Sequence, residues 1–110
     1  MLDTHPLSET HAAQYWRDGY LFPIPVMEAA EAQVHRAELE KIEADYKNWK
    51  ARGLPLPLAT YKRINSHCVM PQAHQIAADP RVLDVIEGIL GPDILIWSVE
   101  FFIKEAQSKS

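Results

Sequence analysis

The feature that most constrains the fold of this chain is a nearly unbroken apolar run close to its end, from Ile94 to Ile103. Eight of the twelve residues from Asp93 to Lys104 are Ile, Leu, Trp, Val or Phe, a β-branched and aromatic bias that is typical of a strand. Such a strand is stable only beside other strands and beneath helices, because its faces and its backbone both need partners. The rest of the chain therefore has to provide those partners.

Helical patterns account for three other segments, at 8–17, 27–51 and 80–90. The last is the best defined, since Asp79 can cap its start, Pro80 suits the first helical position and Gly91 suits a left-handed residue after its end. The long segment has an apolar arc at helical spacing, so we expect it to pack against another element.

Few segments remain to form a sheet. Residues 20–25 contain two prolines and are expected to be extended at a sheet edge, whereas 61–70, after a loop at 51–60, are expected to form a strand or a buried connector. We therefore predict one domain, 1–110, with an α+β fold of only two or three strands. So small a sheet cannot cover the 94–103 run, which predicts that the chain oligomerises or is a piece of a larger protein.

Charge and cysteine content exclude several classes of function. A formal net charge of -4 does not suit a general nucleic-acid or anionic membrane surface, because phosphate binding needs clustered Lys and Arg. The longest apolar run is too short to span a bilayer, and no signal peptide is visible. Since Cys68 is the one cysteine, no internal disulfide is expected, and these features together indicate a cytoplasmic protein.

Two stretches resemble the phytanoyl-CoA dioxygenase family of iron(II)- and 2-oxoglutarate-dependent oxygenases. They are YWRDGYLFPIPV at 15–26 and DPRVLDVIEGILGPDILIWSVEFFIKE at 79–105. The resemblance implies a double-stranded β-helix, a jelly-roll barrel of which this chain would contain the N-terminal helices and first strands. It also implies Fe(II) bound by a His-x-Asp pair and a distal His, 2-oxoglutarate as cosubstrate, and hydroxylation of a small organic or acyl substrate.

The resemblance assigns four residues to the neighbourhood of the cosubstrate: Lys62, Ser98, Glu100 and Phe102. Lys62 would present its ammonium group to a 2-oxoglutarate carboxylate, unless the alignment slips by one residue and Arg63 takes that role. Glu100 would be repelled by that dianion, so a substrate contact or a link to Lys62 or Lys104 suits it better. On a strand, the face with Ser98, Glu100 and Phe102 would either line a polar cavity or be exposed to solvent.

The iron-binding motif itself does not occur in the sequence. The residues two positions after the five histidines are Leu7, Ala13, Ala37, Val69 and Ile76, so no His-x-Asp or His-x-Glu is present. We therefore expect no catalytic residue and no metal ligand, and a chain truncated before the motif that is inactive by itself. Neither Fe(II) nor 2-oxoglutarate is expected to bind it tightly.

Other metal patterns are weak. Glu31, His35 and Glu38 share a helix face but lack matching ligands on other helices. His67, Cys68 and His74 lack the paired spacing of a structural zinc site.

Two hypotheses of different classes follow. The first is the N-terminal part of a dioxygenase that acts on a small-molecule substrate once complete. The second is a small non-catalytic α+β interaction module that buries its apolar strand by dimerising. In both cases the isolated chain is expected to expose apolar surface and to self-associate through it.

Overall fold

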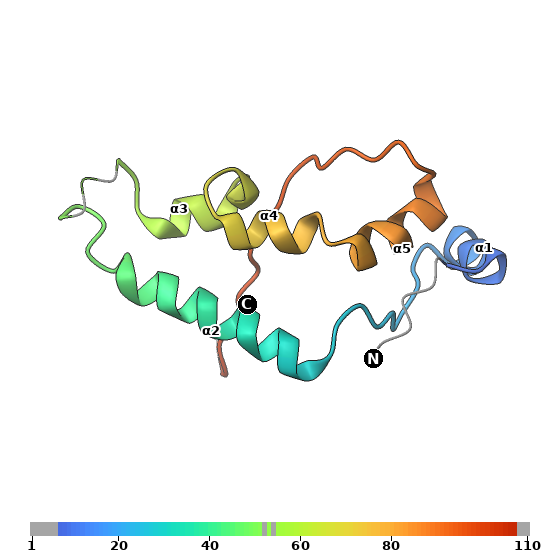
Figure 1. Ribbon diagram of the computed structural model, residues 1–110, viewed down its shortest axis with the longest axis horizontal. Coiled ribbons are helices and arrows are strands. Elements are labelled where there is room, and N and C mark those ends of the chain that lie inside the picture. The colour runs from blue at the N-terminus through green and yellow to red at the C-terminus, as the bar shows by residue number, and fades with distance from the viewer. Residues whose placement is uncertain (1–6, 52, 54, 108–110) are drawn as a thin grey trace.

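The computed structural model describes residues 7–51, 53 and 55–107, and all regular structure in that part of the chain is helical. In chain order the elements are α1 (Glu9–Asp18), α2 (Ala29–Asp45), α3 (Leu58–Arg63), the 3-10 helix η1 (Ser66–Cys68), α4 (Pro71–Ala77) and α5 (Pro80–Leu90). Figure 1 shows α2 along one side of the molecule, with α3, α4 and α5 following one another along the other side.

The helices α1 and α5 form where the local signals predict them. The Ser8 hydroxyl oxygen accepts the His11 N–H at 3.2 Å, and Gly19 ends α1 with φ 80°. Asp79 Oδ1 accepts the Arg81 N–H at 2.8 Å, and Gly91 follows α5 with φ 83°. The predicted helices at 8–17 and 80–90 are therefore confirmed.

The middle of the chain follows the prediction less closely. The helix predicted at 27–51 is shorter and ends at Asp45, and the loop predicted at 51–60 gives way to α3 at Leu58. Residues 61–70 form no strand, since they complete α3 and form η1. The short helix α4 follows, with Pro71 at its first position, and this helix was not predicted.

The predicted α+β fold is wrong, because the residues that the structure describes contain no strand. The expected edge segment 20–25 and the run 94–103 lie in irregular chain, so the double-stranded β-helix implied by the resemblance does not form here. Residues 92–107, which we call the C-terminal ribbon, make two backbone hydrogen bonds to other elements: Ser66 N–H to the Val99 carbonyl at 3.0 Å, and Phe101 N–H to the Lys62 carbonyl at 2.9 Å. Strand propensity needs a paired neighbour to become a strand, and two isolated bonds do not form a ladder.

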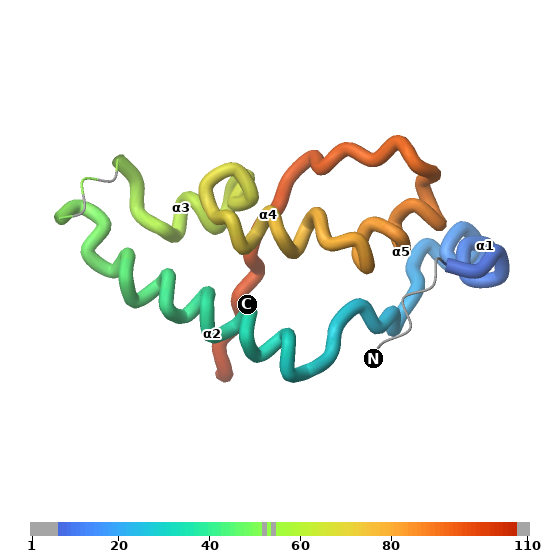
Figure 2. Tube along the Cα trace, in the orientation of Figure 1, coloured from blue at the N-terminus to red at the C-terminus, as the bar shows by residue number. Residues whose placement is uncertain are grey.

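The C-terminal ribbon leaves α5 and arches back towards α3 and η1 (Figure 2). Along this path Leu95, Trp97 and Phe102 are 89%, 88% and 90% exposed. Single exposed apolar residues are ordinary, but three large ones on one extended segment form an apolar surface that no described element covers.

The buried core is small and lies around η1 and α4. Among the described residues, Met70 and Ala73 are the buried apolar residues, and Ser66 and Gln72 are the buried polar ones. The radius of gyration is 16.7 Å, whereas a compact domain of this length has about 13 Å. The fold is therefore elongated and has little enclosed interior.

None of the residues of α2 is fully buried, and polar contacts help to attach this helix to the rest of the molecule. Gln72 Nε2 in α4 donates a hydrogen bond of 2.6 Å to the His35 carbonyl. Ion pairs between side chains attach α2 to α3 and to the start of α5. A different contact is made just before α1, where Leu7 lies so close to Gly88 of α5 that a side chain at position 88 would collide with it.

Candidate functional site

A broad cleft of about 1000 Å³ lies between α3 and the C-terminal ribbon. Its lining residues come from two short stretches: Ala59, Thr60, Lys62, Arg63, Ile64, Glu100, Phe101, Phe102, Ile103, Lys104 and Glu105. We call it the α3 cleft.

Ser66 and the end of α3 bring the two walls of the α3 cleft together. The Val99 carbonyl accepts two hydrogen bonds from Ser66, one from its N–H at 3.0 Å and one from its hydroxyl at 2.7 Å. Ser66 is fully buried, so this double contact is shielded from solvent. Two residues after Val99 on the ribbon, the Phe101 N–H donates to the Lys62 carbonyl. The ribbon therefore passes directly beside the helix that carries Lys62.

Three of the four residues that the resemblance assigns to the cosubstrate lie in the α3 cleft: Lys62, Glu100 and Phe102. Ser98 lies on the ribbon before the cleft begins and does not line it. Arg63, the alternative to Lys62, lines the cleft as well. Since Lys62 and Glu100 lie far apart in the sequence, the path of the ribbon is what brings them together.

The side chain of Lys62 is engaged by α2 rather than by the ribbon. Its Nζ donates to Glu43 Oε1 at 2.5 Å, and the Lys62 side chain is only 19% exposed. The carboxylate that pairs with Lys62 is therefore Glu43, whereas the sequence had suggested Glu100. Glu43 carried no signal in the sequence, because the contact depends on how α2 lies beside α3.

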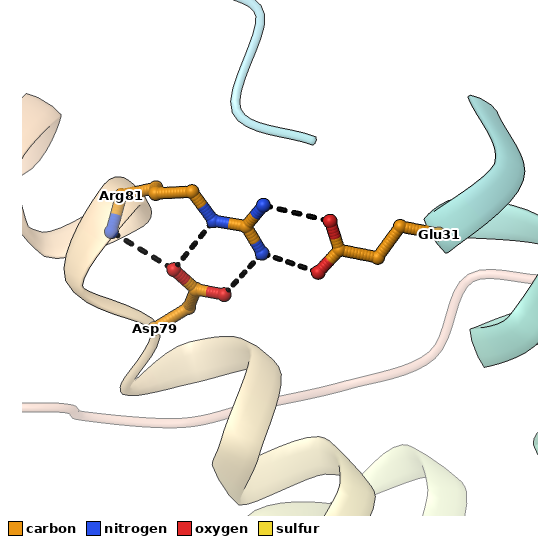
Figure 3. A network of polar contacts seen from close by, with 3 residues as sticks. All are labelled: Glu31, Asp79 and Arg81. Carbon is orange, nitrogen blue, oxygen red and sulfur yellow. Dashed lines mark hydrogen bonds and ion pairs between the residues drawn. The ribbon is translucent and has the colours of Figure 1, made fainter. Parts of the chain in front are cut away.

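A second polar cluster joins α2 to the start of α5 (Figure 3). The Arg81 guanidinium lies between two carboxylates: Nε and Nη2 donate to Asp79 at 3.0 and 2.7 Å, and Nη1 donates to Glu31 Oε2 at 2.7 Å. Its Nη2 also donates to Glu31 Oε1, so both pairs are bidentate. Asp79 additionally caps α5.

This cluster shifts the protonation equilibria of its members. Hydrogen bonds from the Arg81 side chain, aided by its backbone N–H, lower the pKa of Asp79 to about 2. The same side chain lowers the pKa of Glu31, and the two carboxylates raise the pKa of Arg81. All three groups are therefore charged over the physiological range, and the cluster serves attachment rather than proton transfer.

A smaller apolar cavity of about 310 Å³ lies on the other side of α3. Its lining comes from α2, α3 and the start of α4: Ile42, Tyr46, Leu58, Tyr61, Val69, Met70 and Pro71. Its lining includes no charged residue, and Tyr46 and Tyr61 are the residues there that carry a hydroxyl group.

No three His, Cys, Asp or Glu side chains within 7–51, 53 and 55–107 lie where they could bind one metal ion. Neither of the two weak metal patterns gathers three ligands in these residues: Glu31 is engaged by Arg81, and exposed Cys68 contacts His67 Nε2 at 3.6 Å without a third ligand. The described residues therefore do not fit an iron centre. In the same part of the chain, no helix has both the length and the apolar character needed to cross a bilayer.

Comparison with known proteins adds no relative: no family model, no curated protein and no solved structure matches this chain.

Proposed function

We propose that this chain is the N-terminal part of a non-haem Fe(II)- and 2-oxoglutarate-dependent dioxygenase of the phytanoyl-CoA type, working in the cytoplasm on a small organic or acyl substrate. The resemblance at 15–26 and 79–105 supports the family. The observation that carries the proposal is that Lys62 and Arg63 line one cleft with Glu100, which is distant from them in sequence.

The role proposed for the α3 cleft is to contact the 2-oxoglutarate dianion. Lys62 is the proposed donor to one of its carboxylates, and Arg63 in the same wall adds a second positive charge. Glu100 and Phe102, in the opposite wall, are suited to contact the substrate rather than the dianion.

In the family that the chain resembles, molecular oxygen is the oxidant: one of its oxygen atoms enters succinate as 2-oxoglutarate loses carbon dioxide, and the other hydroxylates an aliphatic C–H bond of the substrate. Because the described residues do not fit an iron centre, we derive no step on the metal from them. The proposed contribution of this chain is limited to binding and orienting the cosubstrate.

The experiment is to read the coding sequence beyond Ser110 and to assay its full product. We expect a His-x-Asp motif shortly after Ser110, and succinate formation that depends on Fe(II). Lys62→Met should raise the KM for 2-oxoglutarate by about tenfold or more, because a charge-assisted hydrogen bond is lost. Lys41→Met, at an exposed position of α2, is the matched control and should change nothing. A full product without the motif would refute the proposal.

The exposed ribbon favours a second candidate function, a non-catalytic module that self-associates. Leu95, Trp97 and Phe102 are each almost 90% exposed, which is unusual for a monomer that remains dispersed. If this candidate is right, light scattering should detect a stable dimer of the wild-type chain, and Trp97→Ser should abolish that dimer. A monodisperse monomer that binds no hydrophobic dye would exclude it.

A further inference from the structure

Lys62 is positioned by two different elements. Its backbone belongs to α3, and its carbonyl accepts the Phe101 N–H at 2.9 Å. Its side chain reaches α2, where Nζ donates to Glu43 Oε1 at 2.5 Å. The pair is partly shielded, with side chains 19% and 37% exposed, so solvent screens it less than an ordinary surface pair.

The charge balance of the α3 cleft depends on this pair. Three residues with cationic side chains, Lys62, Arg63 and Lys104, and two with carboxylates, Glu100 and Glu105, line the cleft. Glu43 is not part of the lining, but it neutralises Lys62 from behind. With Lys62 neutralised, two positive and two negative charges remain, so the cleft attracts an anion less strongly than it would if Lys62 were unpaired.

We propose that Glu43 is a positioning residue that competes with a dicarboxylate for Lys62 and so sets the affinity of the α3 cleft for 2-oxoglutarate. This inference rests on the proposed function. A ligand carboxylate bound to Nζ would lie within a few ångströms of the Glu43 carboxylate, and like charges at that distance repel strongly. Glu43 also keeps the lysine side chain ordered, but repulsion between carboxylates that share one ammonium group outweighs that benefit. Removing the charge of Glu43 therefore tightens binding.

The test is a titration of the full chain with 2-oxoglutarate, followed by the backbone amide NMR shifts of residues 59–64 and 100–105. Glu43→Gln should bind about tenfold more tightly than wild type. The matched control is Glu40→Gln, which removes the same charge from the same helix, where Glu40 pairs with Arg36 at 2.9 Å. Its affinity should equal that of wild type.

A neutral probe separates electrostatics from a merely structural effect. The dimethyl ester of 2-oxoglutarate carries no charge, so Glu43→Gln should leave its affinity unchanged, and an equal gain for ester and dianion would overturn the inference. If Glu43→Gln does not fold, Glu43→Asp replaces it. That variant moves the carboxylate away from Nζ by one methylene, and it should tighten binding by a smaller factor.

The outcomes distinguish this inference from the function on which it rests. If the dianion binds wild type, and binding is lost in Lys62→Met but unchanged in Glu43→Gln and Glu43→Asp, the inference fails and the cosubstrate role of Lys62 survives. If no variant binds the dianion at these residues, both fail.

Discussion

Replacing Ser66 by alanine tests how the C-terminal ribbon is attached, and therefore whether the α3 cleft has a defined shape. The substitution deletes the 2.7 Å hydrogen bond from the Ser66 hydroxyl to the Val99 carbonyl but keeps the 3.0 Å bond from the Ser66 N–H. The carbonyl keeps one donor and no buried group loses its last partner, so the cost is that of one net hydrogen bond, about 1 kcal/mol.

This loss of free energy can be measured as a change in the rate of amide hydrogen exchange. A loss of about 1 kcal/mol in the stability of the attached state makes its opening about fivefold more frequent. The Phe101 amide, which donates to the Lys62 carbonyl, should therefore exchange its hydrogen about fivefold faster in Ser66→Ala. Amides of α5 should exchange at the wild-type rate, because that helix is capped independently by Asp79.

The assay is native-state hydrogen exchange read by NMR, with Ser98→Ala as the control on the ribbon itself. An unchanged Phe101 rate in Ser66→Ala would refute the argument that the hydroxyl attaches the ribbon. An equal acceleration at every amide would also refute it, because Ser66 would then belong to the global unfolding unit rather than to a local one.

Three further predictions concern other parts of the molecule. Gly88→Ala gains about 1 kcal/mol of helix propensity, but its new Cβ would lie 2.7 Å from Leu7 Cβ, an overpacking cost of about 1–3 kcal/mol, so urea unfolding should show a net loss that Leu7→Gly reverses. Because Arg81 lowers the pKa of Asp79 from 3.8 to about 2, this carboxylate stabilises the fold above pH 3.8 and the contribution is lost as the pH falls through about 2. Wild type and Asp79→Asn should therefore differ in urea midpoint at neutral pH and converge in acid, and a constant difference would contradict the assignment. Trp97→Ser should reduce the binding of a hydrophobic dye, because Trp97 is 88% exposed, whereas Trp49→Ser in a less exposed position should reduce it less.

The sequence by itself determined the two helices whose ends are capped. Ser8, Gly19, Asp79 and Gly91 act on backbone groups within a few residues, so the signals that start and stop α1 and α5 are local and readable. The same holds for the apolar character of 94–103, which is a property of composition. The end of α2 at Asp45 is followed by Tyr46 rather than by a glycine, α3 begins after Pro57 without a side-chain cap, and both boundaries were missed.

Only the tertiary structure decided what the apolar run does. A strand forms only when its backbone pairs with a neighbouring strand. In the described chain, the backbone of the ribbon bonds to the backbone of other elements at Lys62 and Ser66 only. A segment with strong strand propensity therefore remains irregular. The ion pairs of α2 show the same principle. Lys62 contacts a carboxylate 19 residues earlier, and Arg81 contacts one 50 residues earlier, and these pairings depend on how α2 lies against the later helices. Local sequence specifies hydrogen bonds within a turn, whereas contacts over such separations form only when distant segments meet in space.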